Sequence, residues 1–149
     1  MNVLQIYATN SGSTQLATDI VAQALRTRGA TVTVKNASEA TPDDLKSPDL
    51  IILSSPSWDY QGQDGQPHDD MMRFIGLSEG RILENKPFAV FGLGDSSYPH
   101  FCGAVDVMEQ FVARMKGKLI VPSLRIDGFF FNQEKHTETL KTWVSTIPL

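Results

Sequence analysis

Short apolar runs alternate with stretches of helical periodicity along the whole chain. Some of these runs are apolar at nearly every position, which is typical of parallel strands covered on both faces. The stretch at residues 31–34 is β-branched and alternating instead, so we expect a strand near the edge of the sheet. Five strands are predicted, at about residues 3–6, 31–34, 49–54, 87–92 and 119–126.

The segments between the strands predict helices. In the longer ones, apolar residues recur three or four positions apart and give each helix one buried face. The predicted helices cover about residues 13–28, 41–45, 67–75, 104–115 and 137–145. Because strands alternate with helices, we expect an α/β fold with a doubly wound, five-stranded parallel sheet and helices on both faces. No repeat or linker divides the chain, so we expect one domain over residues 1–149.

Three irregular segments follow the carboxyl ends of predicted strands. They cover residues 8–14, 55–66 and 93–102. In a doubly wound sheet these strand ends meet at one edge, and ligands bind outside that edge. We therefore expect the three segments to converge on one binding site.

The first irregular segment predicts an anion site. Residues 9–14 read Thr-Asn-Ser-Gly-Ser-Thr and carry neither a basic nor an acidic side chain. A strand that turns into a helix through such residues presents backbone N–H groups, hydroxyls and the positive end of a helix dipole, which together suit a phosphate. The alternative is a simple helix cap formed by Ser11, Ser13 or Thr14.

Aromatic side chains in the other two segments predict walls for a planar ring. Trp58 and Tyr60 lie in the middle segment and Tyr98 in the third, among polar residues and glycines. As alternatives, Trp58 packs over its own helix, and Tyr98 is a packing residue tethered by its hydroxyl. A phosphate site and two flat rings at one sheet edge predict a phosphorylated planar cofactor.

Composition narrows the class of partner. The 149 residues are 41% hydrophobic and 20% charged, as in an ordinary soluble protein, and the net charge of −4 argues against a nucleic-acid partner. No apolar run is long enough to span a membrane, and the N-terminus lacks a signal-peptide pattern, so we expect a cytoplasmic protein. The lone Cys102 excludes an internal disulfide, and His68, His100 and His136 form no metal-ligand set.

Motifs in all three irregular segments resemble the flavodoxin family. Residues 91–106, Phe-Gly-Leu-Gly-Asp-Ser-Ser-Tyr-Pro-His-Phe-Cys-Gly-Ala-Val-Asp, resemble the third loop of that family nearly residue for residue. The similarity covers essentially the whole chain, and the fifth predicted strand has no inserted loop, which resembles the short-chain class. The other matching motifs are Thr9-x-x-Gly12-x-Thr14, Ser57-Trp58 and Leu124-Arg125-Ile126-Asp127-Gly128.

The resemblance implies bound FMN, the strand order 2-1-3-4-5 and a one-electron carrier rather than an enzyme. By position, the first segment would hold the phosphate, Trp58 would cover one flavin face at the dimethylbenzene side, and Tyr98 would lie on the other face. Backbone groups of the third segment would meet the polar edge of the ring. The expected cofactor-binding residues are Thr9, Asn10, Ser11, Gly12, Ser13, Thr14, Pro56, Ser57, Trp58, Asp59, Leu93, Gly94, Asp95, Tyr98, Phe101 and Cys102.

Reduction of the flavin would add negative charge to an acidic, aromatic-walled site, so we predict a low potential for the semiquinone/hydroquinone couple. One residue departs from the family pattern. The short-chain family often has glycine after the tryptophan, where a peptide flip stabilises the semiquinone, and this chain has Asp59. A left-handed conformation there costs a non-glycine residue about 1 kcal/mol. We therefore expect a weaker preference for the semiquinone.

The expected partners are redox proteins, namely a reductase-type donor and an acceptor enzyme, and the chain is expected to be a monomer. An acidic rim of Asp64, Asp69, Asp70, Asp95 and Asp106 is a candidate docking surface for a basic partner, and a merely solvated set of charges is the alternative. We expect Cys102 to be a buried residue rather than a reactive thiol. If His100 lies near the flavin, we expect it to adjust the redox potential with pH.

Other functions remain as alternatives. An FMN-dependent quinone or NAD(P)H reductase of the same fold would need an open ring face, which stacking by Tyr98 opposes, and would oxidise NAD(P)H rapidly by two electrons. A receiver domain needs an acidic cluster where this chain has Thr9, Asn10 and Ser11. The chain also lacks the Gly-Lys-Ser/Thr of P-loop NTPases, the G-x-G-x-x-G of nicotinamide-binding domains and the G-x-S-x-G of hydrolases.

Overall fold

The computed structural model describes all residues, 1–149, and its centre is a parallel β-sheet. The long apolar runs of the sequence form its middle strands; the first six residues of the strand that begins at Leu50, for example, are all buried. The strands are β1 (Asn2–Tyr7), β2 (Thr31–Asn36), β3 (Leu50–Tyr60), β4 (Gln63–Pro67), β5 (Pro87–Gly94), β6 (Lys118–Leu119) and β7 (Leu124–Asp127).

The sheet has the order β2-β1-β3-β5-β6, and β7 also pairs with β5. All of these pairs are parallel, whereas β4 is antiparallel to β3. If β6 and β7 are counted as one interrupted strand, this is the order 2-1-3-4-5, so the predicted doubly wound α/β fold is confirmed. The strand order reverses beside β1, and such a reversal creates a crevice at the carboxyl ends of the strands.

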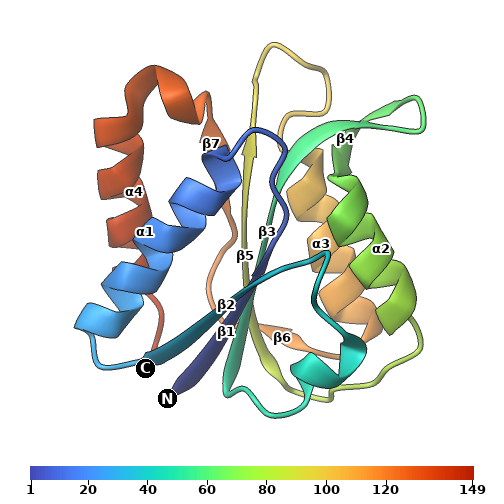
Figure 1. The fold of residues 1–149 in the computed structure, drawn as a ribbon, viewed down its shortest axis with the longest axis vertical. Coiled ribbons are helices and arrows are strands. Elements are labelled where there is room, and N and C mark those ends of the chain that lie inside the picture. Colours follow the sequence, from blue (N-terminus) through green and yellow to red (C-terminus); the bar gives the residue numbers. More distant parts are fainter.

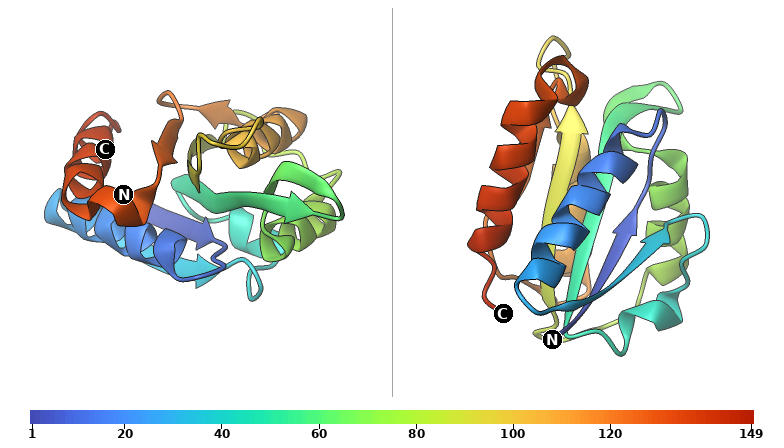
Figure 2. Two further views of the ribbon diagram at one scale, coloured as in Figure 1. Left: turned by 90° about the horizontal axis from the view of Figure 1, so that it is seen from above. Right: turned by 60° about the vertical axis from the view of Figure 1, so that its left-hand side comes forward.

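Helices cover both faces of the sheet (Figure 1). The helices α1 and α4 pack on one face, over a core that includes Leu25, Ile52 and Trp143. The helices α2 and α3 pack on the other face, with Phe74 and Phe111 in edge-to-face contact. The two views of Figure 2 show these layers on either side of the strands. The helices are α1 (Ser13–Thr27), α2 (Asp69–Ser78), α3 (Gly103–Arg114) and α4 (Gln133–Ser145), and the 3₁₀ turns are η1 (Pro42–Leu45) and η2 (Phe129–Asn132).

The prediction of an irregular segment at residues 55–66 is wrong, because most of these residues form strand. β3 continues to Tyr60, and a hairpin leads into β4, with Tyr60 paired to Gln63. The two residues of the turn, Gln61 and Gly62, both have positive φ (52° and 86°), as a type I′ hairpin requires. The turn is further stabilised by the backbone N–H of Gly62, which donates to the Asp59 carboxylate at 2.8 Å.

The fifth predicted strand is interrupted, which the sequence analysis did not anticipate. β6 pairs with the start of β5, β7 pairs with its end, and residues 120–123 lie between them. Pro122 in this interval has no N–H to donate to a strand ladder. The interval contains four residues and no inserted loop, which agrees with the short-chain class. The last helix also begins earlier than predicted, at Gln133.

Candidate functional site

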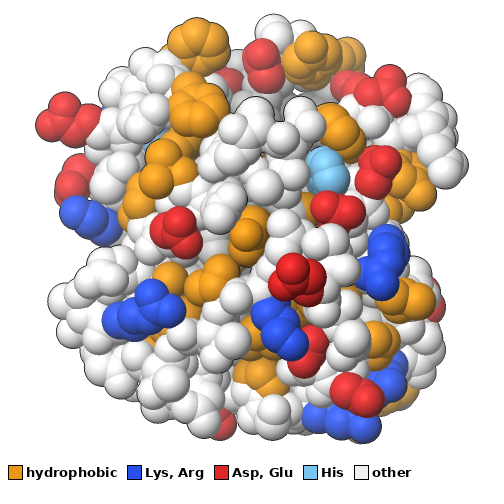
Figure 3. Space-filling model, viewed as in Figure 1, with side chains coloured by type: hydrophobic (Ala, Val, Ile, Leu, Met, Phe, Trp, Pro, Cys, Tyr) orange, Lys and Arg blue, Asp and Glu red, His pale blue; other side chains and the backbone are white.

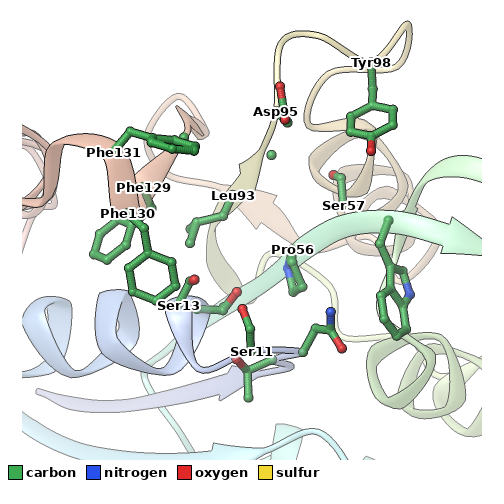
Figure 4. Close-up of a pocket in the computed structure, with 16 residues that line it drawn as sticks. Ser11, Ser13, Pro56, Ser57, Leu93, Asp95, Tyr98, Phe129, Phe130 and Phe131 are labelled. Carbon is green, nitrogen blue, oxygen red and sulfur yellow. The ribbon is translucent and has the colours of Figure 1, made fainter.

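The carboxyl ends of β1, β3, β5 and β7 border one cavity of about 430 Å³ (Figure 4). The three irregular segments therefore meet at one sheet edge, as expected from the doubly wound topology. Most of the residues that the sequence analysis named for the site line this cavity. These are Thr9, Asn10, Ser11, Ser13, Thr14, Pro56, Ser57, Trp58, Leu93, Gly94, Asp95 and Tyr98.

A second cavity of about 340 Å³ adjoins the first, because Ser57, Trp58, Asp95 and Tyr98 line both. Asp59 and Cys102 line this second cavity. The remaining two candidates line neither cavity. Gly12 contributes only backbone at the start of α1, and Phe101 packs against the core beside α3.

The loop before α1 leaves donors available to a ligand. Gly12 precedes the helix in the left-handed conformation (φ 95°), and no side chain caps the helix N-terminus, so the simple capping alternative is wrong. The Thr9 hydroxyl accepts the N–H of Gly12 at 2.9 Å and closes the loop. The Thr14 hydroxyl is buried, lines the cavity and has no hydrogen-bond partner within the protein. A buried hydroxyl without a partner is costly, so its position favours a ligand acceptor in the cavity.

Trp58 stands between the cavity and α2. Its ring stacks on His68, with centroids 4.6 Å apart and planes inclined by 24°. His68 is itself fixed at the start of α2, since its Nδ1 accepts the N–H of Asp70 at 3.1 Å. The Trp58 indole N–H is buried without a partner. The alternative that Trp58 packs over its own helix is therefore partly right, because Trp58 packs against the start of α2 and also lines the cavity.

The segment after β5 is held rigidly by hydrogen bonds to two carboxylates. Ser97 donates its hydroxyl and its N–H to Asp95, at 2.6 and 2.8 Å, and Ser96 donates in the same way to Asp127. These bonds lower the pKa of both Asp95 and Asp127, and in each case the bond from the serine hydroxyl contributes more than the bond from the N–H. Both groups therefore stay anionic at neutral pH. Tyr98, at the tip of this segment, is 60% exposed.

Cys102 is a structural residue of the cavity floor. It adopts a left-handed conformation (φ 50°) directly before α3, and its thiol is fully buried. Burial raises the pKa of the thiol to about 11. A Cβ on Gly94 would come within 2.9 Å of Cys102 Sγ, so a larger residue does not fit at Gly94 without a shift. The expectation of a buried, unreactive thiol agrees with this geometry.

One wall of the main cavity was not predicted from the sequence. Gly128, Phe129, Phe130 and Phe131 also line it. Figure 4 shows the ring of Phe130 beside Ser13, across the cavity from Tyr98. Phe130 and Phe131 are 53% and 93% exposed, which is unusual for phenylalanine. These residues follow the carboxyl end of β7, so the rule that selected the other three segments would have selected them too.

The cavity carries no basic side chain. The two ionisable side chains that line it are the Asp95 carboxyl and the Tyr98 phenol. Figure 3 shows apolar and acidic side chains along the upper edge of the molecule, where the cavity opens, and most lysine and arginine side chains lower down. A bound phosphate would therefore be held by N–H and O–H donors rather than by cations. No helix of the structure combines the length and the apolarity needed to cross a lipid bilayer.

These features define a doubly wound α/β protein that binds a phosphate-bearing planar ligand at the switch point of its sheet. The model of the flavodoxin family matches residues 6–143, and the chain belongs to the flavodoxin family. A flavodoxin of Maridesulfovibrio salexigens is 33% identical over 126 residues, which cover 84% of this chain and 85% of that protein.

Solved structures agree with this assignment. Oxidised flavodoxin 2 from Bacillus cereus superposes with a TM-score of 0.87 at 26% identity and covers 98% of this chain and 97% of its own. The flavodoxin of Fusobacterium nucleatum bound to flavin mononucleotide shares the fold, with a TM-score of 0.82 at 17% identity over 97% of this chain and 95% of its own. Flavodoxins are FMN-containing electron carriers and not enzymes.

Proposed function

We propose that the two adjoining cavities together hold one FMN and that the chain carries electrons singly, at low potential, between redox proteins. Bound FMN supplies an isoalloxazine ring that accepts and releases one electron at a time. The observation that carries this proposal is the pair of buried, unpartnered donors on two different segments of the site, the Thr14 hydroxyl and the Trp58 indole N–H. Both line the cavity that the carboxyl ends of the strands form.

The segment before α1 would hold the phosphate. Its first-turn N–H groups lack a side-chain cap, and the hydroxyls of Ser11, Ser13 and Thr14 face the same cavity. Such a set of donors, at the positive end of a helix dipole, binds phosphate without a cation. The negative charge of the phosphate then stays largely uncompensated in the site.

Trp58 and Tyr98 would form the walls of the ring site. Trp58 is held on one side by His68, and Tyr98 is held by the hydrogen-bonded segment that carries Asp95. Leu93 and Gly94 line the main cavity and Cys102 lines the adjoining one, and their backbone groups would meet the polar edge of the ring. Negative charge on the phosphate and on Asp95 opposes the formation of a second, anionic reduced state, which supports a low potential.

Redox proteins would dock on the upper edge of the molecule. The carboxylates of Asp95 and Asp127 are exposed there and accept hydrogen bonds from serines, and neither forms an ion pair with a lysine or an arginine. Beside them lie the exposed rings of Phe130 and Phe131. An apolar anchor within an acidic rim suits a reductase-type donor and an acceptor enzyme that present an apolar patch among basic residues.

The other members of the predicted acidic rim contribute less to this surface. Asp106 pairs with Arg125 at 2.7 Å, and Asp70 lies at the first turn of α2 beside His68. We propose that the carrier works as a monomer in the cytoplasm, where its single thiol stays reduced.

The visible absorption spectrum during stepwise reduction tests the proposal. The purified chain, loaded with FMN, should be yellow, should pass through a blue one-electron-reduced form and should bleach at full reduction. The colourless chain should take up one equivalent of added FMN. A chain that takes up no FMN would contradict the cofactor assignment. Direct bleaching without a detectable intermediate would contradict the one-electron role.

A further inference from the structure

His100 forms a side-chain contact between two elements of the site. It lies in the segment after β5, and its Nδ1 contacts the Asp64 carboxylate of the β3–β4 hairpin at 2.6 Å. Both side chains line the cavity of about 340 Å³ that Trp58 and Tyr98 also line. The ion pair therefore spans the side of the cavity, from the strand next to Trp58 to the segment that carries Tyr98.

The backbone holds the two partners in register. A Cβ on Gly65 would overlap the side chain of His100, and a Cβ on Gly103 would overlap the carbonyl oxygen of Gly65. Only glycines permit this close approach of the hairpin to the segment after β5 and to the start of α3. The position of His100 against Asp64 thus follows from backbone packing and not from the reach of a flexible side chain.

The contact with His100 is the one side-chain hydrogen bond that the Asp64 carboxylate makes. The second oxygen of this carboxylate, Oδ2, is buried and has no hydrogen-bond partner, and the Asp64 side chain is 30% exposed while that of His100 is 70% exposed. His100 is the one basic side chain that pairs with Asp64, and no lysine or arginine forms an ion pair with this carboxylate. A charged imidazolium adds an ion pair to the hydrogen bond with the carboxylate, whereas a neutral imidazole offers the hydrogen bond alone.

We infer that His100 is a positioning residue of the cofactor site, which in its protonated form fastens the β3–β4 hairpin to the segment after β5. Protonated His100 holds the hairpin next to Trp58 against the segment that carries Tyr98, and loss of the proton weakens this contact. Histidine titrates close to neutrality, so the strength of cofactor binding becomes sensitive to physiological pH. This inference rests on the proposal that the cavities hold FMN.

The other ionisable groups around His100 are mostly acidic. The hairpin presents Asp64, β3 presents Asp59, and the segment that carries His100 presents Asp95 and Tyr98. On the side of α3, Asp106 lines the neighbouring cavity with His100, but Arg125 pairs with it at 2.7 Å. The buried thiol of Cys102 stays neutral, because burial raises its pKa to about 11.

The test compares the FMN dissociation constants of the native chain and the H100Q variant from pH 5.5 to pH 8.5, by quenching of FMN fluorescence. Glutamine keeps a hydrogen-bond donor but does not titrate. The native chain should lose an additional factor of about two to five in affinity as pH rises, relative to H100Q, the range typical of a partly exposed ion pair. The difference between the two proteins removes the effect of the phosphate, which titrates in the same range.

Two further variants make the result specific. D64N should remove the same pH step, and H136Q, which removes a histidine of α4 that stacks on Phe129, should keep it. In the FMN-free chain, the amide resonance of Gly65 should move with pH in the native protein and not in H100Q.

Parallel pH profiles for the native chain and H100Q, or a Gly65 resonance that moves equally in both, would overturn the inference while leaving FMN binding intact. A native chain that binds no FMN at any pH would instead overturn the proposed function.

Discussion

Ser96 donates two hydrogen bonds to Asp127, one from its backbone N–H at 2.9 Å and one from its hydroxyl at 2.6 Å. The pair ties the segment after β5 to the end of β7, next to Asp95 and Gly128, which line the cavity. Because Asp127 is exposed, the bonds hold this segment in place but do not isolate it from solvent. The N–H of Gly128 adds a backbone bond to the carbonyl oxygen of Gly94 at 3.0 Å.

The hydrogen bonds between Ser96 and Asp127 should weaken in acid. Its hydrogen bonds with Ser96 lower the pKa of Asp127 below the ordinary 3.8. A carboxyl with a lowered pKa stabilises the folded arrangement above the unfolded-state pKa and loses that contribution as pH falls through the folded-state pKa. In an NMR titration of the FMN-free chain, the Ser96 amide resonance should therefore move with a midpoint below pH 3.8.

The D127N variant should abolish that movement, because asparagine does not titrate in this range. Asn substitution of Asp19, an exposed carboxyl on α1, is the matched control and should leave the Ser96 titration unchanged. The Ser97 amide should still titrate in both variants, since it donates to Asp95. A Ser96 resonance that moves near or above pH 4 would show that Asp127 is not the group that holds this segment.

Thr14→Val should separate ligand binding from stability. Valine keeps the shape of Thr14 and removes a buried hydroxyl that has no partner in the protein, so the FMN-free variant should be at least as stable as the native chain. FMN affinity should fall about tenfold to a hundredfold, the effect of losing one hydrogen bond to a charged group, roughly 1.5–3 kcal/mol. Urea unfolding and fluorescence titration measure the two quantities.

Thr18→Val is the matched control for Thr14. Thr18 is equally buried, one turn further along α1, but its hydroxyl bonds Ser54 at 3.2 Å inside the protein. Its replacement should therefore lower the free energy of unfolding by about 1 kcal/mol and leave FMN affinity near the native value. If T14V and T18V lose FMN affinity equally, the Thr14 hydroxyl does not contact the phosphate.

The sequence predicts the parts of the fold that depend on local pattern. The buried strand that begins at Leu50 is apolar on consecutive positions, and the segments at strand ends lie together because parallel strands all point their carboxyl ends to one edge. The hairpin after Pro56 depends instead on pairing between polar residues, which periodicity does not detect. Its one local signal is Gln61-Gly62, two positions with positive φ between paired residues.

The aromatic wall was missed for a different reason. Adjacent phenylalanines predict burial, and only Phe129 is buried, while Phe131 is 93% exposed. Hydrophobicity alone does not distinguish a core residue from one that borders a binding cavity. The break between β6 and β7 was equally hidden, since the segment around Pro122 is apolar enough to resemble continuous strand.

Phe131 should contribute to partner docking without contributing to the fold. Because its ring is 93% exposed, Phe131→Ser should leave the free energy of unfolding unchanged within about 0.5 kcal/mol. The second-order rate of reduction by a reductase that uses this carrier should fall roughly tenfold, as for loss of one apolar anchor of an interface. Stopped-flow absorbance at varied carrier concentration measures that rate.

Leu77→Ser is the matched control for Phe131. Leu77 is 53% exposed near the end of α2, away from the cavity, so its replacement should leave the reduction rate at the native value. Equal rates for F131S and the native chain would show that partners dock elsewhere on the surface.

Asp59→Gly should increase the amount of one-electron-reduced flavin that accumulates during a redox titration. Asp59 lies in β3 with negative φ, and the positive φ values of the hairpin fall at Gln61 and Gly62. Its carboxylate accepts the Gly62 N–H at 2.8 Å and restrains the backbone next to Trp58. Glycine removes both this restraint and the steric cost of rotating the adjacent peptide, about 1 kcal/mol.

Asp59→Ala distinguishes these two causes. Alanine also lacks the bond to Gly62, but it keeps a Cβ and with it the resistance to a left-handed conformation. We expect the one-electron-reduced fraction, measured by spectroelectrochemistry, to rise in the order native, D59A, D59G. Equal increases in D59A and D59G would assign the effect to the lost carboxylate. No change or a decrease in D59G would show that the peptide after Trp58 does not control this fraction.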